Sequence, residues 1–203
     1  MILDRGYVRR LNKSDASAVF AVRQEAYQSS EQFKVLNFSY LEWDDVDDIA
    51  IVLGVFNQKN ELLASLRGEI IRTRQEAEAK LHYSISPKLD LFPGVLLGRG
   101  ATSRISRNKG FNSLLRYYYL GLGIDFPFKS MFASVFEKAP RIGLLRDMNY
   151  RFTIPDDSHD SQIHVVTREY FVYLERKQFL PSFKFLETKF KDVISRYPWT
   201  GLI

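Results

Sequence analysis

The stretch Arg107-Asn108-Lys109-Gly110-Phe111-Asn112 decides the fold prediction, because it joins a short apolar segment at 94–97 to a long helix-like run. A strand–turn–helix connection leaves the first N–H groups of the helix unpaired, and such groups can hold a phosphate. Arg107 and Lys109 add positive charge at the same end, and Gly110 has no side chain to obstruct an anion. The six residues therefore predict an anion-binding turn.

The glycine spacing excludes two other phosphate-binding turns. A Walker A loop needs Gly-x-x-x-x-Gly-Lys-Ser/Thr, which the segment 100–110 does not supply. A dinucleotide fingerprint needs three spaced glycines, whereas this turn contains only Gly110. An ordinary basic turn before a surface helix stays open as an alternative on these six residues alone.

Length and composition predict one α/β domain that spans residues 1–203. Hydrophobic residues make up 45% of the chain and charged residues 26%, which is enough for a packed core. The lack of cysteine excludes disulfides, zinc–thiolate sites and a cysteine nucleophile, and the three scattered histidines show no metal-ligand spacing. We find no bilayer-spanning segment and no signal-peptide core, so we expect a cytoplasmic protein without a bound metal.

The formal net charge of +5 suits several anionic partners, including nucleic acid, an anionic membrane, an acidic carrier protein and a polyphosphate. The basic residues are dispersed, and the sequence carries no aromatic RNA-binding signature. Nucleic-acid binding is therefore the weakest of the functional hypotheses.

Hydrophobic periodicity predicts alternating strands and helices. We expect strands at 7–10, 49–56, 62–71, 94–103, 130–136 and 165–174, the second and third forming a hairpin that is slightly long or bulged at its turn. We expect helices after the capping pair Ser14-Asp15 and at 73–81, 110–123, 139–148 and about 181–197.

The stretch 107–112 resembles the Arg/Gln-x-x-Gly-x-Gly/Ala pattern of the GCN5-related N-acyltransferase (GNAT) superfamily, with Asn112 in place of the second small residue. Segment 139–150 resembles the helix that this family places after its fifth strand, and Asn149-Tyr150 stands where Gly-Phe is common. The resemblance implies a mixed, largely antiparallel central sheet flanked by helices, with a C-terminal helix. It also implies that 107–112 grips the pyrophosphate of coenzyme A.

The N-terminal half is more similar to acyl-homoserine lactone synthases and N-acyl amino acid synthases. The matching elements are Arg23-x-x-x-Tyr27, Trp43, an Asp-x-x-Asp pair within Asp45–Asp48, Ser65-Leu66-Arg67 and Gly98-Arg99. By this resemblance, the residues expected to border the acceptor or the acyl entrance are Arg23, Tyr27, Trp43, Asp45 and Asp48. The acidic run is equally compatible with a solvated loop.

Two expected catalytic groups are absent. Leu96 stands where the lactone and amino-acid synthases carry a glutamate, and Leu145 stands where the GNAT family often has a tyrosine acid. Glu69, beside Arg67, is the first candidate for a substitute base, although the two side chains could also form a purely structural pair. We therefore name Glu69, Arg67 and Arg99 as catalytic candidates.

The same resemblance implies which residues contact the acyl donor. The family stabilises the oxyanion with backbone N–H groups of its fourth strand, which here implies Ala101, Thr102 and Ser103. Arg104 either faces the acyl donor or is exposed. Arg23, Arg67 and Arg99 are candidates to bind the carboxylate of an acceptor, because guanidinium groups pair bidentately with carboxylates.

These residues together predict an N-acyltransferase that moves an acyl group from acyl-coenzyme A or acyl-carrier protein to an amine, such as an amino acid. We expect direct attack without an acyl-enzyme, since no Ser–His or Cys–His motif is visible. No permanently bound cofactor is implied, because the acyl donor is a co-substrate. The alternative is a catalytically inactive module of the same fold that binds acyl-coenzyme A or acyl carrier.

Overall fold

Seven strands form one mixed sheet in the computed structural model, which describes residues 5–28, 33–35, 37–155, 163–165 and 168–201. The strand order is β1-β3-β4-β5-β6-β9-β7, and every neighbouring pair is antiparallel except β5 and β6. The strands are β1 (Gly6–Arg10), β3 (Ile51–Asn57), β4 (Leu62–Ile71), β5 (Gly94–Thr102), β6 (Ser130–Phe136), β7 (Arg151–Thr153) and β9 (Glu169–Glu175). A separate pair joins β2 (Phe33–Val35) to β8 (Ile163–Val165). The predicted mixed, largely antiparallel sheet is confirmed.

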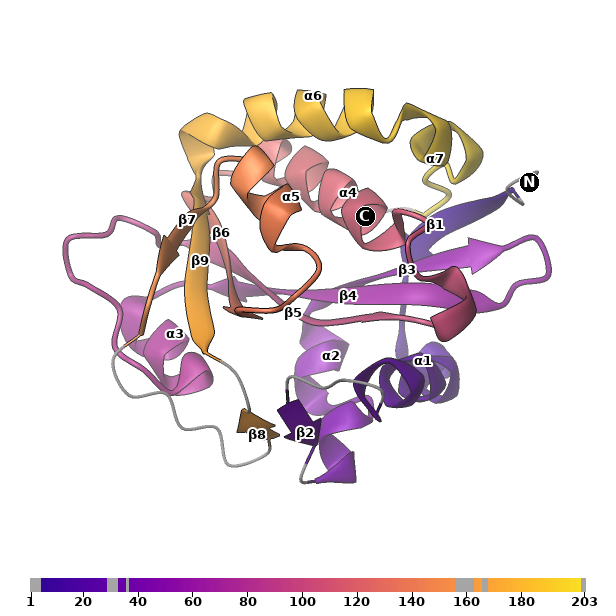
Figure 1. The fold of residues 1–203 in the computed structure, drawn as a ribbon, viewed down its shortest axis with the longest axis horizontal. Helices are drawn as coiled ribbons and strands as arrows, with labels where there is room; N and C mark the ends of the chain where they lie inside the picture. Colours follow the sequence, from indigo (N-terminus) through magenta and orange to yellow (C-terminus); the bar gives the residue numbers. More distant parts are fainter. Residues whose placement is uncertain (1–4, 29–32, 36, 156–162, 166–167, 202–203) are drawn as a thin grey trace.

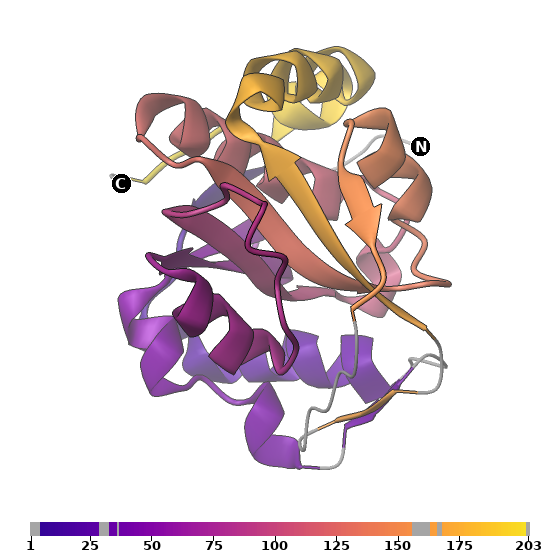
Figure 2. The ribbon, with the colours of Figure 1, turned by 90° about the vertical axis from the view of Figure 1, so that its left-hand side faces the viewer.

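Helices cover both faces of this sheet (Figures 1 and 2). One face carries α4 (Phe111–Asp125), with α5 (Ile142–Asp147), α6 (Phe179–Lys189) and α7 (Lys191–Arg196) around it. The other face carries α1 (Ala16–Gln28), α2 (Asp45–Ile49) and α3 (Arg74–Leu81). Four short 3-10 helices lie at Lys13–Asp15, Phe38–Leu41, Arg104–Ser106 and Arg176–Gln178. The flanking helices are therefore also as predicted.

Several predicted boundaries are wrong in detail. The C-terminal helix is two helices, because the backbone at Phe190 turns to φ −117° and ψ 23° between α6 and α7. The helix predicted at 139–148 begins only at Ile142, because the N–H of Ala139 bonds back to the carbonyl of Phe136 in a turn. The 49–56/62–71 hairpin is present with a bulge at Val55/Phe56.

The hydrophobic core holds α4 against the sheet. Leu114, Leu115 and Leu120 of α4 are fully buried. The buried Tyr119 hydroxyl donates to the backbone carbonyl of Leu66 at 3.0 Å and also to that of Ile51. This contact fixes α4 over β3 and β4, so the turn before α4 lies at the end of β5.

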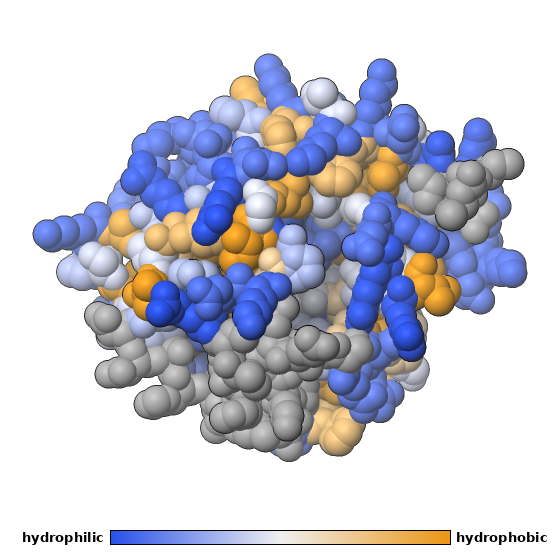
Figure 3. Space-filling model, in the orientation of Figure 1, coloured by the Kyte–Doolittle hydropathy of each residue, from blue (hydrophilic) through white to orange (hydrophobic). Residues whose placement is uncertain are grey.

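The described surface in the view of Figure 3 is mostly hydrophilic, with hydrophobic side chains in small groups. Within the described residues, we find no helix of the length and apolarity that crossing a bilayer requires.

Candidate active site

Strands β5 and β6 separate partway along their length. Their parallel pairing joins Gly94–Leu96 to Ser130–Phe132 and stops there, while β5 continues to Thr102 and β6 to Phe136. Alternate N–H groups of a strand point to opposite edges, so β5 directs backbone donors into the wedge that opens between the two strands. The wedge is a place where an extended ligand can replace the missing strand contacts.

A β-bulge distorts β5 at the same level. Ser65 of β4 pairs with Ala101 and Arg67 pairs with Gly98, so one residue of β4 faces two residues of β5. Arg99, inside the bulge, has a left-handed backbone with φ 51°. Bulges re-aim backbone and side chains and occur next to active sites, and this one lies beside the wedge.

The turn between β5 and α4 leaves the start of the helix without a side-chain cap. Gly110 is the N-cap residue with φ 81°, and no side chain caps the helix. The first N–H groups of α4 are therefore available to an external acceptor. Arg107 and Asn108 are exposed beside this helix end, and Lys109 is half-buried.

The reason for the glycine differs from the prediction. A Cβ atom on Gly110 would lie 3.0 Å from Cδ1 of Phe190 and 3.6 Å from Cγ2 of Val193. The absent side chain thus makes room for the C-terminal helices and permits the positive φ. An anion does not approach from that direction.

The predicted donor-side residues have different environments. The N–H of Ser103 donates to the carbonyl of Leu63 at 2.9 Å, so this amide is not an oxyanion donor and that part of the prediction is wrong. The N–H of Arg104 donates to Glu25 Oε1 at 2.9 Å, and its side chain is exposed. Ala101 is buried and Thr102 is half-buried, both at the end of β5.

The start of α4 contributes side chains to the interior. The Phe111 ring is buried against Tyr197, with 4.9 Å between ring centroids. Asn112 Oδ1 accepts a hydrogen bond from Arg116 Nε at 3.1 Å. The Phe111 ring is therefore directed away from the predicted phosphate site, to which this residue could contribute only its backbone N–H.

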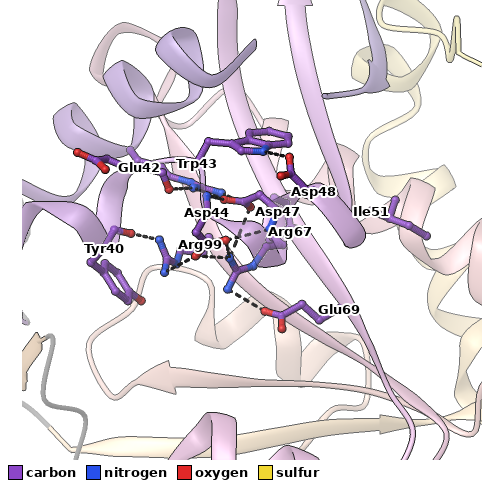
Figure 4. Close-up of polar contacts among 12 residues, drawn as sticks. Tyr40, Glu42, Trp43, Asp44, Asp47, Asp48, Ile51, Arg67, Glu69 and Arg99 are labelled. Atoms are coloured by element: carbon purple, nitrogen blue, oxygen red, sulfur yellow. Dashed lines mark hydrogen bonds and ion pairs between the residues drawn. The ribbon is translucent and has the colours of Figure 1, made fainter. Parts of the chain in front are cut away.

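A chain of ion pairs lies on the α1/α2 face of the sheet (Figure 4). Asp47 Oδ1 and Oδ2 accept from Arg23 Nη2 and Nη1, each at 2.8 Å, and both side chains are fully buried. Asp44 accepts from Arg67 at 3.1 Å and from Arg99 at 3.1 Å, and Arg67 lies 3.5 Å from Asp47. The three arginines come from α1, β4 and β5, so the network ties these elements together at the bulge.

These pairs shift pKa values in directions set by burial and charge. Burial raises the pKa of Asp47, but the hydrogen bonds and charge of Arg23 outweigh it, so the pKa is lowered overall. Burial lowers the pKa of Arg67, while Glu69, Asp47 and Asp44 raise it above the ordinary value. Burial dominates at Arg99 and lowers its pKa. Asp47 therefore stays ionised.

Glu69 lies between two cations. Its Oε1 is 2.8 Å from Arg67 Nη2 and its Oε2 is 2.7 Å from Lys80 Nζ, and the residue is 6% exposed. Glu69 on β4 pairs directly with Leu96 on β5. Directly opposite residues share one face of a sheet, so the Glu69 carboxylate lies one strand away from Leu96, where the sequence resemblance led us to expect a glutamate.

The predicted acceptor residues do not share one cleft. Tyr27 packs edge-on against Tyr40 with ring centroids 6.0 Å apart, and the Arg99 guanidinium lies 4.0 Å above the same Tyr40 ring. Trp43 Nε1 donates to Asp48 Oδ1 at 2.7 Å instead. Trp43 and Asp48 line a different pocket of about 590 Å³, together with Arg9, Arg10 and Lys13.

Two of the acceptor predictions are wrong. The Arg23 guanidinium is 0% exposed and its two Nη atoms are paired with Asp47, so it presents no accessible donor to an acceptor. The Asp-x-x-Asp pair that contacts the arginines is Asp44/Asp47, whereas Asp45 and Asp48 are exposed. The missed signal was the capping box, since Asp44 caps α2 and accepts from the N–H of Asp47 at 2.9 Å.

The two leucines at the expected acid and base positions are buried. Leu145 is 0% exposed and Leu96 is 7% exposed. Neither position offers a proton-transfer group, as the sequence predicts.

Comparisons with known proteins add information on the fold. The sequence matches no protein-family model and no curated protein. An N-acetyltransferase structure from Staphylococcus aureus superposes with a TM-score of 0.57 at 12% identity, covering 85% of this chain and 98% of that chain. An acetyltransferase from Corynebacterium glutamicum gives a TM-score of 0.58 at 13% identity, with 83% and 95% coverage. A candidate acetyltransferase from Salmonella typhimurium, solved with its cofactor acetyl-CoA, gives 0.57 at 12% identity, with 84% and 94% coverage. With identities this low the likeness concerns the fold, and the chain has the fold of the GNAT N-acetyltransferases.

Proposed function

We propose that this protein transfers an acyl group from a thioester, acyl-coenzyme A or acyl-carrier protein, to an amine. The observation that carries the proposal is the wedge between β5 and β6, with the bulge at Arg99 beside it. The uncapped start of α4 lies at the end of the same strand. The acetyl-CoA bound to the Salmonella typhimurium protein of the same fold supports a thioester as the donor.

The donor would lie with its phosphate groups at the start of α4. The N–H of Arg107 donates to the carbonyl of Arg104, so the proposed contacts are the backbone N–H groups from Asn108 to Asn112. These groups, the helix dipole and Lys109 favour a negative charge at this end. The rest of the donor would extend along the wedge, where β5 N–H groups face the thioester carbonyl. One well-placed oxyanion donor contributes roughly 3–4 kcal/mol to the transition state.

The reaction would be direct. The amine nitrogen attacks the thioester carbonyl carbon, the carbon–sulfur bond breaks, the electron pair leaves on the thiolate, and a proton leaves the nitrogen. Positioning of the two reactants supplies about 7–11 kcal/mol in such reactions, more than a general base contributes. The loss of a glutamate at Leu96 and of a tyrosine at Leu145 is therefore compatible with activity.

Glu69 is our candidate for the base that takes the proton, directly or through water. Its carboxylate projects from β4 beside Leu96, on the face that also carries Arg67. The ion pairs with Arg67 and Lys80 hold it in place. Arg67 is thus a positioning residue for the base in this proposal.

For the acceptor we propose an amino acid or a similar small amine. The support is the likeness to the lactone and amino-acid synthases, now with the Asp44/Asp47 pair in contact with Arg67 and Arg99. Arg99 and Tyr27 both lie against Tyr40. These residues would border the acceptor end of the wedge.

Binding and turnover can be measured separately. Isothermal titration with coenzyme A, acetyl-CoA and a long-chain acyl-CoA tests the donor site, and thiol release in the presence of an amino-acid mixture tests transfer. We expect binding and release in a sequential kinetic pattern. Parallel ping-pong lines or a trapped acyl-serine would contradict direct attack, and lack of binding to any thioester or to acyl-carrier protein would contradict the function itself.

Glu69→Gln separates catalysis from binding. We expect turnover to fall by up to about two orders of magnitude, the usual range for a general base, while donor affinity stays within twofold. Glu61→Gln is the matched control, because Glu61 is an exposed residue next to the start of β4. Equal rates for both variants would remove the role of Glu69.

A second candidate function is an inactive module that binds the acyl donor. The buried leucines at positions 96 and 145 favour it, because neither can transfer a proton. Tight donor binding without thiol release for any amine in the mixture would support the module over the enzyme.

A further inference from the structure

Among the residues that the structure describes, two arginines in the α4/α5 layer have no carboxylate partner. Arg116 of α4 is 3% exposed, and its Nη1 is buried without a hydrogen-bond partner. Arg141 precedes α5 as its N-cap residue, and its Nε is also buried without a partner. Among the ion pairs of the described residues, none includes either arginine.

The pair lies next to the wedge. Asn112, which accepts from Arg116 Nε, has its Nδ2 3.3 Å from the point where Gly100 would carry a Cβ. Gly100 belongs to the part of β5 that no longer pairs with β6. Arg116 therefore lies beside the separation of the strands, and the charge of Arg141 is near enough to act on that of Arg116.

No described carboxylate forms an ion pair with either arginine. On the other face, Arg23, Arg67 and Arg99 each have a carboxylate within 3.1 Å. Here burial and the neighbouring charge of Arg116 lower the pKa of Arg141 to about 10. The hydroxyl of Tyr150, beside Arg116, is buried as well. Arg116 is buried, whereas Arg141 is half-buried with only its Nε fully covered. A buried cation without a counter-charge is strongly unfavourable, so an anionic ligand would stabilise Arg116 and its neighbour.

We propose that Arg116 and Arg141 bind a carboxylate carried by one of the two small substrates. The carboxylate is either on the acyl chain of the donor or on an amino-acid acceptor, and the inference rests on the proposed transferase function. Two guanidinium groups and a tyrosine hydroxyl supply planar donors that match a carboxylate. The phosphates of the donor have a separate place, one helical turn away at the start of α4.

Two comparisons identify the source of the carboxylate. In the acyl arm, calorimetry compares succinyl-CoA with 4-methylpentanoyl-CoA, which has the same shape without the charge, and coenzyme A serves as the reference. In the acceptor arm, thermal shift with coenzyme A present compares each amino acid with its amide. We expect the charged compound to bind about 10- to 100-fold more tightly in one arm, the usual range for charge-assisted hydrogen bonds.

Three variants test the residues. Arg116→Met and Arg141→Met should each abolish the preference for the carboxylate and leave coenzyme A affinity within about threefold. Arg146→Met is the control, because Arg146 is exposed on α5 and contacts only the Phe152 ring in the described contacts. It should retain the full preference.

A second measurement needs no ligand. Removing an uncompensated cation should leave the melting temperature of Arg141→Met equal to or above that of the wild type, whereas Arg23→Met, which breaks a buried pair, should melt lower. A fall for Arg141→Met as large as that for Arg23→Met would show a structural role and overturn the inference.

The remaining outcomes separate the two proposals. If coenzyme A binds but neither arm shows a preference for the carboxylate, the inference is wrong and the proposed function stands. The same holds if both arginine variants keep the preference. Failure of every thioester and of coenzyme A to bind counts against the proposed function, and the inference falls with it.

Discussion

The buried pair Arg23–Asp47 gives the sharpest stability prediction, because one substitution removes its charge and leaves its shape. Asp47→Asn keeps an oxygen that can accept from the N–H of Asp44, so the start of α2 is preserved. The variant leaves the Arg23 guanidinium fully buried with a neutral partner. Breaking a buried pair in this way costs about 3–5 kcal/mol of unfolding free energy.

The pH dependence of this loss has a definite sign. The pKa of Asp47 is lowered in the folded protein, since the Arg23 interaction outweighs the effect of burial. A lowered carboxyl pKa contributes stability that is present above the unfolded value of about 3.9 and is lost as the pH falls through the folded value. The difference between wild type and Asp47→Asn should therefore be constant from pH 7 to about pH 5 and shrink below about pH 4.

Urea denaturation of the wild type and of Asp47→Asn at several pH values measures the difference in their unfolding free energies. The two free energies can be compared if the m-values are equal. The double variant Arg23→Met/Asp47→Leu is the control, because replacing both charges by apolar groups is often neutral or stabilising. A loss below about 1 kcal/mol for Asp47→Asn, or a difference that does not change down to pH 3, would refute the argument.

Four further substitutions test single positions. Gly110→Ala should lose at least about 1 kcal/mol in urea denaturation, because the backbone has φ 81° and Phe190 lies 3.0 Å from the new Cβ. Gly143 is exposed in α5, and a Cβ added there would have no atom within 4 Å. Gly143→Ala should therefore raise the unfolding free energy by about 0.4–1 kcal/mol. Equal effects at the two glycines would contradict this prediction. Thr73→Ala removes the side-chain cap of α3 and should cost about 1 kcal/mol, so a thermal transition like that of the wild type would speak against the cap. Ser182→Ala removes a buried 2.7 Å hydrogen bond to a backbone carbonyl and should cost about 1–3 kcal/mol, which the same denaturation series would detect.

The mixed, largely antiparallel sheet was expected from the resemblance of 107–112 and 139–150 to the GNAT superfamily. The strand–turn–helix at 94–123 and the hairpin of β3 and β4 could be predicted from local patterns, since apolar runs define the strands and Gly110 marks the start of α4. The absence of acid and base at positions 145 and 96 was also visible, because it depends only on residue type. These features need no knowledge of distant contacts.

The partners of the charged residues depended on the tertiary structure. Within Asp44–Asp48, two registers fit an Asp-x-x-Asp pattern, and only the packing of α2 against α1 and β4 turned Asp44 and Asp47 inward to the arginines. The sequence likewise contained no sign that Arg116 Nη1 and Arg141 Nε would be buried without a hydrogen-bond partner among the described residues. Such pairings join residues far apart along the chain, and they follow from the directions in which whole elements pack. Local propensity fixes the elements, whereas the burial and charge balance at the wedge arise only when the layers come together.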